Sequence, residues 1–313
     1  MRIVGADELD RLLTYPALID ALEQAFRADI TVPARHNHSL DHGATLLLMP
    51  AWTNRDGAER FLGCKYVTVF PTNAQAGLPS LHGTYLLASG DTGEPLAVMD
   101  GRALTAWRTA AASALAARHL ARGDAEHLLM VGAGALAPYL VRAHAAVRPI
   151  KRVTLWNRTR SRAVALAFGL SVGGIEAVVA DDLENAAREA DIISCATLSH
   201  EPLVRGAWLK KGAHLDLVGG FTPKMREADD QAVKRARVYV DARDGAKKAG
   251  DIVGPLKRGV IKAADIRGDL FELCRGAARG RTSETQITLF KSVGHALEDL
   301  AAAMLAWKLL RGS

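Results

Sequence analysis

The feature that most constrains the fold of this chain is a glycine-rich turn between an apolar strand and a helix. Gly132, Gly134 and Ala137 stand at the spacing GxGxxA, directly after the apolar run at 128–131. The glycines permit a tight turn and a close approach of the backbone to a pyrophosphate, and a small Ala137 lets the helix pack closely on the sheet. The first N–H groups of that helix would point at the phosphates. Because a second strand pattern runs up to Asn157, the segment predicts a Rossmann dinucleotide-binding domain of the α/β class, with a doubly wound sheet.

The residues at the end of the second strand predict which cofactor binds, because they meet the ribose 2′ position. An acidic residue would repel a 2′-phosphate, but this chain has Asn157, Arg158 and Thr159, followed by Arg160 and Arg162. An amide, a hydroxyl and a planar guanidinium suit a phosphate dianion. We therefore expect NADPH to be preferred, and NADH stays open as a cofactor. The alternative is that these arginines form only the solvated start of a helix.

Strand and helix patterns alternate after the glycine turn. We expect strands at 175–180, 192–195, 214–218 and 238–242, and a helix at 183–190. Ligands of such sheets bind outside the carboxyl ends of the strands, so the residues that follow the strands should surround the cofactor. The predicted cofactor-binding residues are Gly132, Gly134, Ala135, Leu136, Ala137, Asn157, Arg158, Thr159, Arg162, Ala196, Thr197, Val218, Gly219 and Ser292.

The first hundred residues show a different pattern. Segments 44–52, 61–71, 80–88 and 95–101 are short and apolar, with the turn sequence DTGEP before the last, which predicts a meander of antiparallel strands. Apolar residues recur at helical spacing at 15–28 and again at 286–310. We expect the second of these helices to return to the first domain.

Composition and charge argue against several other classes of protein. A chain of 313 residues with a formal charge of +6 and no run of five like charges favours an anionic small molecule over nucleic acid. Cys64, Cys195 and Cys274 form neither a disulfide framework nor a metal motif. The sequence has no signal-peptide pattern and no apolar run of membrane-spanning length. We expect a soluble, cytoplasmic protein that binds no metal, membrane or nucleic acid.

Four polar residues stand out in or beside the apolar elements of the first domain. Lys65 lies within the strand pattern at 61–71, and His82 and Thr84 share one face of the next one, at 80–88. Arg108 lies near the start of an alanine-rich helix at 101–122. Each has an ordinary structural interpretation, since strand lysines usually reach solvent and helix-start arginines are often exposed. A helix start is also where a substrate carboxylate is welcome, because the dipole and the guanidinium act together.

Several stretches together resemble the ornithine cyclodeaminase/mu-crystallin family. They are VPARH at 32–36, GCKYVTVFP at 63–71, the segment 77–122, GAGALA at 132–137, LWNRTRSRA at 155–163 and TLFKSVGHALEDLAAA at 288–303. The resemblance implies a homodimer whose α+β substrate and dimerisation domain comes from both chain ends, here 1–118 and 298–313, around a Rossmann domain at 119–297. It also implies that Arg35 binds the substrate carboxylate and that Lys65, Thr84 and Arg108 contact substrate or nicotinamide.

Two departures from the family pattern matter. Leu136 stands where members usually have Gln, which would remove a side-chain contact in the glycine turn. Phe221 stands where cyclodeaminases and the related alanine dehydrogenases carry an Asp. A carboxylate there serves the amine chemistry, and Phe cannot move a proton. The pattern therefore resembles that of ketimine reductases, which reduce Δ1-pyrroline-2-carboxylate or Δ1-piperideine-2-carboxylate to L-proline or L-pipecolate.

In the expected mechanism, Arg35 and Arg108 hold the substrate carboxylate and Lys65, with its protonated form disfavoured by two neighbouring cations, lends a proton to the imine nitrogen. His82 and Thr84 would orient the nicotinamide, the substrate or a water. Three alternatives stay open: an ornithine cyclodeaminase, an amino-acid dehydrogenase, and an NADPH-dependent binding protein without turnover. A single methylene separates the two ring sizes, so the sequence does not choose between them.

Overall fold

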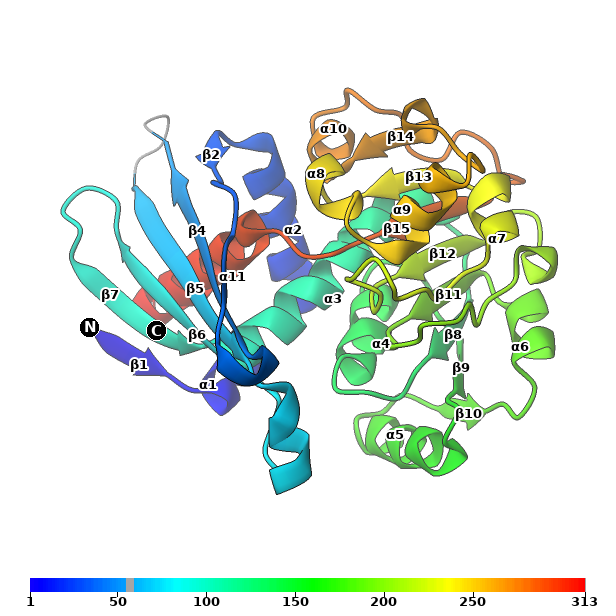
Figure 1. The fold of residues 1–313 in the computed structure, drawn as a ribbon, viewed down its shortest axis with the longest axis horizontal. Coiled ribbons are helices and arrows are strands. Elements are labelled where there is room, and N and C mark those ends of the chain that lie inside the picture. Colours follow the sequence, from blue (N-terminus) through cyan, green and yellow to red (C-terminus); the bar gives the residue numbers. More distant parts are fainter. Residues whose placement is uncertain (55–58, 313) are drawn as a thin grey trace. The chain divides into compact units, whose positions relative to one another are not determined.

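The computed structural model describes residues 1–54 and 59–312, which form two compact units (Figure 1). Unit 1 is Met1–Thr109 together with His295–Ser313, and unit 2 is Ala110–Gly294. The division falls within helix α3 (Gly101–Leu120) and just before helix α11 (Ala296–Gly312). The fold is α/β, as predicted, with a mixed sheet in unit 1 and a parallel sheet in unit 2.

The sheet of unit 1 has the strand order β1-β7-β6-β5-β4-β2, and β3 also pairs with β4. The described pairs are antiparallel except for β1 with β7, so the predicted meander is correct for its four long strands. The elements are β1 (Arg2–Val4), α1 (Ala6–Leu12), α2 (Tyr15–Arg27), β2 (Ile30–Thr31), β3 (His36–Ser39), the 3-10 turn η1 (Asp41–Gly43), β4 (Thr45–Thr53), β5 (Phe61–Val69), η2 (Pro71–Ala76), β6 (Leu81–Ser89) and β7 (Pro95–Asp100).

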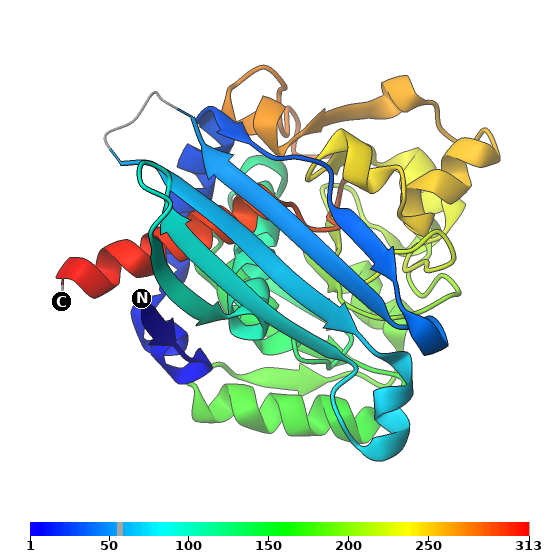
Figure 2. The same cartoon turned by 60° about the vertical axis from the view of Figure 1, so that its left-hand side comes forward.

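Strand β5 shows how this sheet divides into a covered and an open face. Phe61, Gly63, Lys65 and Val67 are buried while alternate residues such as Tyr66 are exposed, because successive side chains of a strand point to opposite faces. The buried face packs against α11, which contacts β4, β5, β6 and α2. Figure 2 shows the other face toward the viewer, with α11 behind the sheet.

The sheet of unit 2 has the order β10-β9-β8-β11-β12-β15-β13-β14, and its described pairs are all parallel. Its strands are β8 (His127–Val131), β9 (Arg152–Trp156), β10 (Ala177–Val179), β11 (Ile192–Cys195), β12 (His214–Leu217), β13 (Arg237–Val240), β14 (Ile266–Asp269) and β15 (Thr288–Lys291). The chain leaves β8 in one direction across the sheet and returns to β11 on its other side. This change of direction is the topological switch point, where doubly wound sheets bind dinucleotides.

The helices of unit 2 connect these parallel strands. They are α4 (Ala137–Ala145), α5 (Arg160–Val172), α6 (Leu183–Glu189), α7 (Asp230–Arg235), α8 (Arg243–Ala246), α9 (Gly250–Lys257) and α10 (Leu270–Cys274), with 3-10 turns η3 (Gly206–Trp208) and η4 (Ala263–Asp265). The core between them is aliphatic, with Leu129, Ile193, Leu215 and Leu289 fully buried on neighbouring strands.

The predicted helix at 286–310 is wrong in its first part. Thr288–Lys291 is strand β15, which lies between β12 and β13 in the parallel sheet, and the helix begins only at Ala296. A strand that is buried on both faces is a continuous apolar run, which periodicity does not distinguish from a buried helical turn. The apolar positions of β15 therefore merged with those of α11 into one apparent helical pattern.

Candidate active site

The glycine turn lies at the switch point of the unit 2 sheet. Gly132 has φ +106°, a conformation that favours glycine, and its N–H donates to the carbonyl oxygen of Trp156 at 2.8 Å. A Cβ at Gly132 would lie 2.7 Å from the carbonyl oxygen of Ala196. A Cβ at Gly134, in contrast, would have no protein atom within 4 Å. Gly132 is therefore required by the fold, whereas Gly134 keeps open the side on which a ligand would approach.

Helix α4 begins directly after this turn. Its N-cap, Leu136, makes no side-chain capping bond, and Ala137 is fully buried against the sheet. The N–H groups of an uncapped first turn attract anions, and the helix dipole adds to that attraction. These features fit the pyrophosphate of a dinucleotide, which Gly134, Ala135 and Leu136 would bind through their backbone.

The residues at the end of β9 that are predicted to contact the ribose make different interactions. The Asn157 side-chain oxygen accepts from Ala133 N–H at 3.2 Å, and its amide donates to the Thr159 carbonyl at 2.9 Å. Asn157 therefore holds the glycine turn in place. Arg158 and Arg162 are exposed, whereas Arg160 pairs with Asp181 at 2.6 Å. Exposure therefore separates Arg158 and Arg162 from the ion-paired Arg160, and it does not rank the first two.

The loops after β11 and β12 lie side by side, because these two strands pair directly. Ala196 and Thr197 follow β11, and Val218 and Gly219 follow β12. Gly219 packs against the Thr197 backbone so closely that a Cβ would collide with it. Ser292 follows β15, the strand next to β12, and its backbone N–H donates to the carbonyl oxygen of Leu217 at 3.2 Å. It therefore lies at the same edge of the sheet as Val218 and Gly219.

In unit 1, Lys65 and Arg108 are brought together by two carboxylates of α11. Lys65 Nζ lies 2.7 Å from Asp299 Oδ2 and donates to Thr105 Oγ1 at 3.2 Å. Arg108 donates through Nε to Asp299 at 2.9 Å and through Nη1 to Glu298 at 2.7 Å. The four charged side chains are buried, with Lys65 only 3% exposed. Two cations thus face two anions, and the cluster is balanced in charge.

The electrostatics of this cluster separate its two cations. Burial lowers the pKa of Lys65 to about 8, Asp299 opposes that shift, and Arg108 adds to it. Burial also acts on Arg108, but Asp299 and Glu298 outweigh it and raise its pKa, so Arg108 stays charged. The expected cause of the Lys65 shift, two neighbouring cations, is therefore only partly correct, since burial is the larger effect. A lysine with this pKa can exchange a proton near neutral pH.

The structure does not place the other predicted substrate residues of unit 1 with Lys65. Lys65 pairs across the strands with Tyr85, so Thr84 and His82 point to the opposite, exposed face of the sheet. Arg35 is also exposed and directly precedes the edge strand β3. Within one copy of the chain, Lys65 and Arg108 therefore form one group on the buried face of the sheet, whereas His82 and Thr84 lie on its other face. The predicted contacts of His82 and Thr84 with nicotinamide, substrate or water stay predictions.

Phe221 follows Gly219 and Gly220 in the loop after β12 and is 55% exposed. The nearby acidic residues are Glu227 and Asp251, which are buried within unit 2. Sequence reasoning missed these two and the pair Glu298 and Asp299. A signal existed for the second pair, since adjacent acids inside the alanine-rich stretch ALEDLAAA are unusual unless they meet cations.

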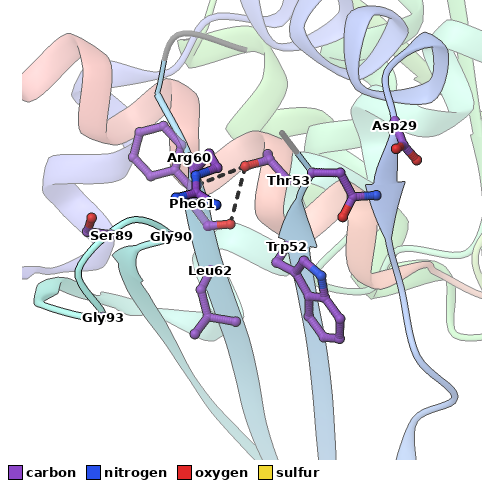
Figure 3. Close-up of a pocket in the computed structure, with 10 residues that line it drawn as sticks. Asp29, Trp52, Thr53, Arg60, Phe61, Leu62, Ser89, Gly90 and Gly93 are labelled. Atoms are coloured by element: carbon purple, nitrogen blue, oxygen red, sulfur yellow. Dashed lines mark hydrogen bonds between the residues drawn. The ribbon is translucent and has the colours of Figure 1, made fainter. Parts of the chain in front are cut away.

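A separate pocket of about 670 Å³ opens at one end of the unit 1 sheet (Figure 3). Its wall includes Trp52, Thr53 and Phe61, and Thr53 exchanges hydrogen bonds with the Phe61 backbone. Neither Lys65 nor Arg108 lines it.

Within 1–54 and 59–312, no group of three or more His, Cys, Asp or Glu side chains is arranged to hold a metal ion. No helix in that part of the chain has the length and apolar character to cross a membrane.

Unit 2 has a glycine turn at the switch point of a parallel sheet, and unit 1 buries a lysine and an arginine that pair with two carboxylates. These features define a two-unit α/β protein of the Rossmann dehydrogenase class. The chain belongs to the ornithine cyclodeaminase/mu-crystallin family, whose model matches residues 3–312. The family resemblance seen in the sequence is thereby confirmed.

Relatives match this chain over nearly its whole length. Protein SAR DEFICIENT 4 of Arabidopsis thaliana is 43% identical over 96% of this chain and 95% of its own. The Delta(1)-pyrroline-2-carboxylate reductase of Colwellia psychrerythraea is 38% identical over 97% of each chain. Among solved structures, the Delta(1)-pyrroline-2-carboxylate reductase of Thermococcus litoralis, in complex with NADH and L-proline, superposes with a TM-score of 0.93 at 34% identity, covering 100% of this chain and 98% of that one.

The open side of Gly134 gives a direct test of the cofactor site. We expect Gly134→Ala to raise the dissociation constant of the nicotinamide cofactor about 10-fold or more, because the new methyl group occupies the space that a pyrophosphate needs. Stability should change by less than about 0.5 kcal/mol, because the methyl group meets no protein atom. Fluorescence titration and thermal melting measure the two effects.

The matched control is Gly123→Ala, where a Cβ also has no neighbour within 4 Å. Unchanged cofactor affinity in Gly134→Ala, or an equal loss in both variants, would contradict this placement of the pyrophosphate.

Proposed function

We propose that this protein reduces the cyclic imine Δ1-pyrroline-2-carboxylate to L-proline with a reduced nicotinamide cofactor. Support comes from the Colwellia and Thermococcus relatives, which are named for this reaction, and from the NADH and L-proline in the Thermococcus complex. The proposal extends to the six-membered Δ1-piperideine-2-carboxylate and L-pipecolate, because a single methylene changes binding by only about 1–3 kcal/mol.

The observation that carries the proposal is the buried Lys65 ammonium with a pKa of about 8, held by Asp299 beside Arg108. Reduction of a C=N bond needs a hydride at carbon, a proton at nitrogen and a grip on the substrate carboxylate. The bound nicotinamide supplies the hydride. Lys65 donates the proton through Nζ, and Asp299 stabilises its charged form beforehand.

Arg108 contributes the grip on the carboxylate. Its Nε and Nη1 bond Asp299 and Glu298, and a guanidinium has five N–H donors. The donors on Nη2 are therefore the ones that we assign to the substrate carboxylate, with Arg35 as a second cation as the family resemblance implies. Because Glu298 and Asp299 balance Lys65 and Arg108, the anionic substrate binds by directed hydrogen bonds more than by net positive charge.

Phe221 distinguishes this reaction from cyclodeamination. An amine must lose a proton before a hydride can leave its carbon or before its nitrogen can attack an imine, and a carboxylate after Gly219 and Gly220 would serve that step. Phe221 cannot accept a proton, and its exposed ring suits an apolar ring substrate. A preformed imine avoids the step altogether.

The proposal includes a homodimer in the cytoplasm. Apolar side chains gather on the open face of the unit 1 sheet, where Leu62, Tyr66 and Leu86 are each at least 40% exposed on β5 and β6. Exposed apolar patches on a sheet mark surfaces that bind protein. A second copy is the partner that the family resemblance implies.

The first prediction of this proposal concerns the reaction itself. The purified chain should oxidise NADPH or NADH when given Δ1-pyrroline-2-carboxylate, and it should release no ammonia from L-ornithine. Absorbance of the reduced nicotinamide and an ammonia assay measure the two activities, and chromatography identifies L-proline. Ammonia release without imine reduction would contradict the proposal, and cofactor binding without either reaction would favour a binding protein.

The proton-donor role of Lys65 predicts a pH dependence. A donor must be protonated, so kcat/KM should fall about tenfold per pH unit above a midpoint near pH 8, the pKa of Lys65. Lys65→Met should lower kcat/KM by about 10²–10⁴-fold and remove this alkaline decline. The exposed Lys211→Met is the control and should change neither. A Lys65→Met enzyme with full kcat/KM would rule out proton donation by this residue.

Preference for NADPH is a separate proposal that rests on Arg158. Arg158→Ala should raise KM for NADPH about 10-fold and leave KM for NADH nearly unchanged, because a charge-assisted bond to the 2′-phosphate is lost. Arg160→Ala, whose guanidinium already pairs with Asp181, should have a smaller effect. Equal kcat/KM for both cofactors in the unaltered enzyme would contradict the preference while leaving the reductase proposal intact.

A further inference from the structure

A buried group of charged side chains lies beneath the carboxyl ends of the central strands of unit 2 and has no part in the proposed proton transfer. Its members are Glu227, Asp251 of α9 and Lys291 of β15, and all three are fully buried. Lys291 Nζ lies 3.4 Å from Asp251 Oδ2 and 3.9 Å from Glu227 Oε2. Buried ions are costly unless they are paired, so this group needs a reason for its presence.

Glu227 accepts hydrogen bonds from two different loops. Its Oε1 accepts from the N–H of Thr197 at 2.7 Å and from the Thr197 hydroxyl at 2.8 Å. Its Oε2 accepts from the N–H of Gly219 at 2.8 Å and from that of Gly220 at 3.3 Å. An ionised carboxylate can accept about four such bonds. One side chain therefore joins the loop after β11 to the loop after β12.

The other two members hold Glu227 itself. Asp251 Oδ1 accepts hydrogen bonds from the backbone N–H of Glu227 at 2.8 Å and from that of Ala228 at 3.2 Å. These bonds fix the backbone from which the Glu227 side chain projects. Burial raises the pKa of Glu227 to about 7, and Lys291 opposes that shift. The ammonium of Lys291 thus helps to keep Glu227 ionised, the form that accepts from four donors.

We propose that Glu227, held by Asp251 and Lys291, is a positioning residue for the nicotinamide end of the cofactor, because it fixes the Thr197 and Gly219 loops together. This inference rests on the proposed function, in which unit 2 binds a nicotinamide dinucleotide across its switch point. The pyrophosphate and the adenosine ribose of that cofactor would be bound by the glycine turn and by the residues at the end of β9. Among the described residues, the side-chain hydrogen bonds of Glu227 come from the β11 and β12 loops, so its effect should be confined to one end of the ligand.

The test compares two ligands on the full-length chain carrying Glu227→Gln. Glutamine keeps the shape but directs an amide N–H₂ at a backbone N–H of one of the two loops, which should displace that loop. We expect the dissociation constant of NADPH to rise about 10-fold or more. Affinity for adenosine 2′,5′-bisphosphate, which lacks the nicotinamide, should stay within about twofold. Fluorescence and calorimetric titrations give the two constants without any turnover.

Asp216→Asn is the matched control. Asp216 is another fully buried carboxylate of unit 2, and it accepts from Ser194 at 2.7 Å and from Ser113 at 3.0 Å without bonding either loop. It should lower the melting temperature and leave the ratio of the two affinities unchanged. A purely structural role of Glu227 would give the same result in Glu227→Gln, and that outcome would overturn the proposal.

A milder variant covers the case in which Glu227→Gln does not fold. Thr197→Val removes the hydroxyl bond to Glu227 at 2.8 Å, together with a longer bond of 3.4 Å from the Ser199 N–H, and keeps the backbone bond from Thr197 to Glu227. It should shift the affinity ratio in the same direction by a few fold. An unchanged ratio in Thr197→Val would overturn the inference. Unaltered protein that binds neither NADPH nor NADH would overturn the proposed function as well, whereas normal cofactor binding with an unchanged affinity ratio in the variants would overturn the positioning role alone.

Discussion

Unit 1 depends on the buried ion pairs that Asp299 makes with Lys65 and Arg108. The two ends of the chain meet in this unit, and Asp299 of α11 bonds a strand and a helix that lie 234 and 191 residues earlier in the sequence. Removing one partner of a buried pair leaves an uncompensated charge, which typically costs about 3–5 kcal/mol. A single carboxylate therefore joins the C-terminal helix to the sheet, and it also opposes the effect of burial on the pKa of the lysine that we assign to catalysis.

The balance of charge in that cluster changes how the substrate carboxylate is expected to bind. Sequence reasoning assigned the substrate carboxylate to positively charged side chains, whereas the structure places Glu298 and Asp299 directly against Arg108, and Asp299 also against Lys65. Two cations without these partners would repel each other in a buried site. With them, Arg108 stays charged and rigidly oriented, and Lys65 keeps a pKa at which its proton can leave. Orientation, more than net charge, then selects the ligand.

More of the fold than of the candidate site could be predicted from the sequence, because the fold follows from local patterns and the site from contacts between distant residues. The glycine turn, the antiparallel meander and most strands of the parallel sheet follow from local patterns, so each was visible in a short window of sequence. Strand β15 was missed because a strand buried on both faces has no alternation to read. The partners of Lys65 were missed because nothing local links residue 65 to residue 299. The sequence did not show that Thr84 and Lys65 lie on opposite faces, because the cross-strand register, which places Tyr85 opposite Lys65, is a property of the assembled sheet.

The presence of Asp299 beside Lys65 raises the question of whether it replaces the carboxylate that Phe221 lacks. Burial alone would raise the pKa of Asp299, but Arg108 and Lys65 outweigh that effect and lower it. A carboxylate that is stabilised as an anion by two cations is a weak base, so it would not take a proton from a substrate amine. Glu227 has the raised pKa that a base needs, but its oxygens already accept four bonds within unit 2. Of these two carboxylates, then, neither is suited to deamination, and imine reduction is the chemistry that the arrangement of charges favours.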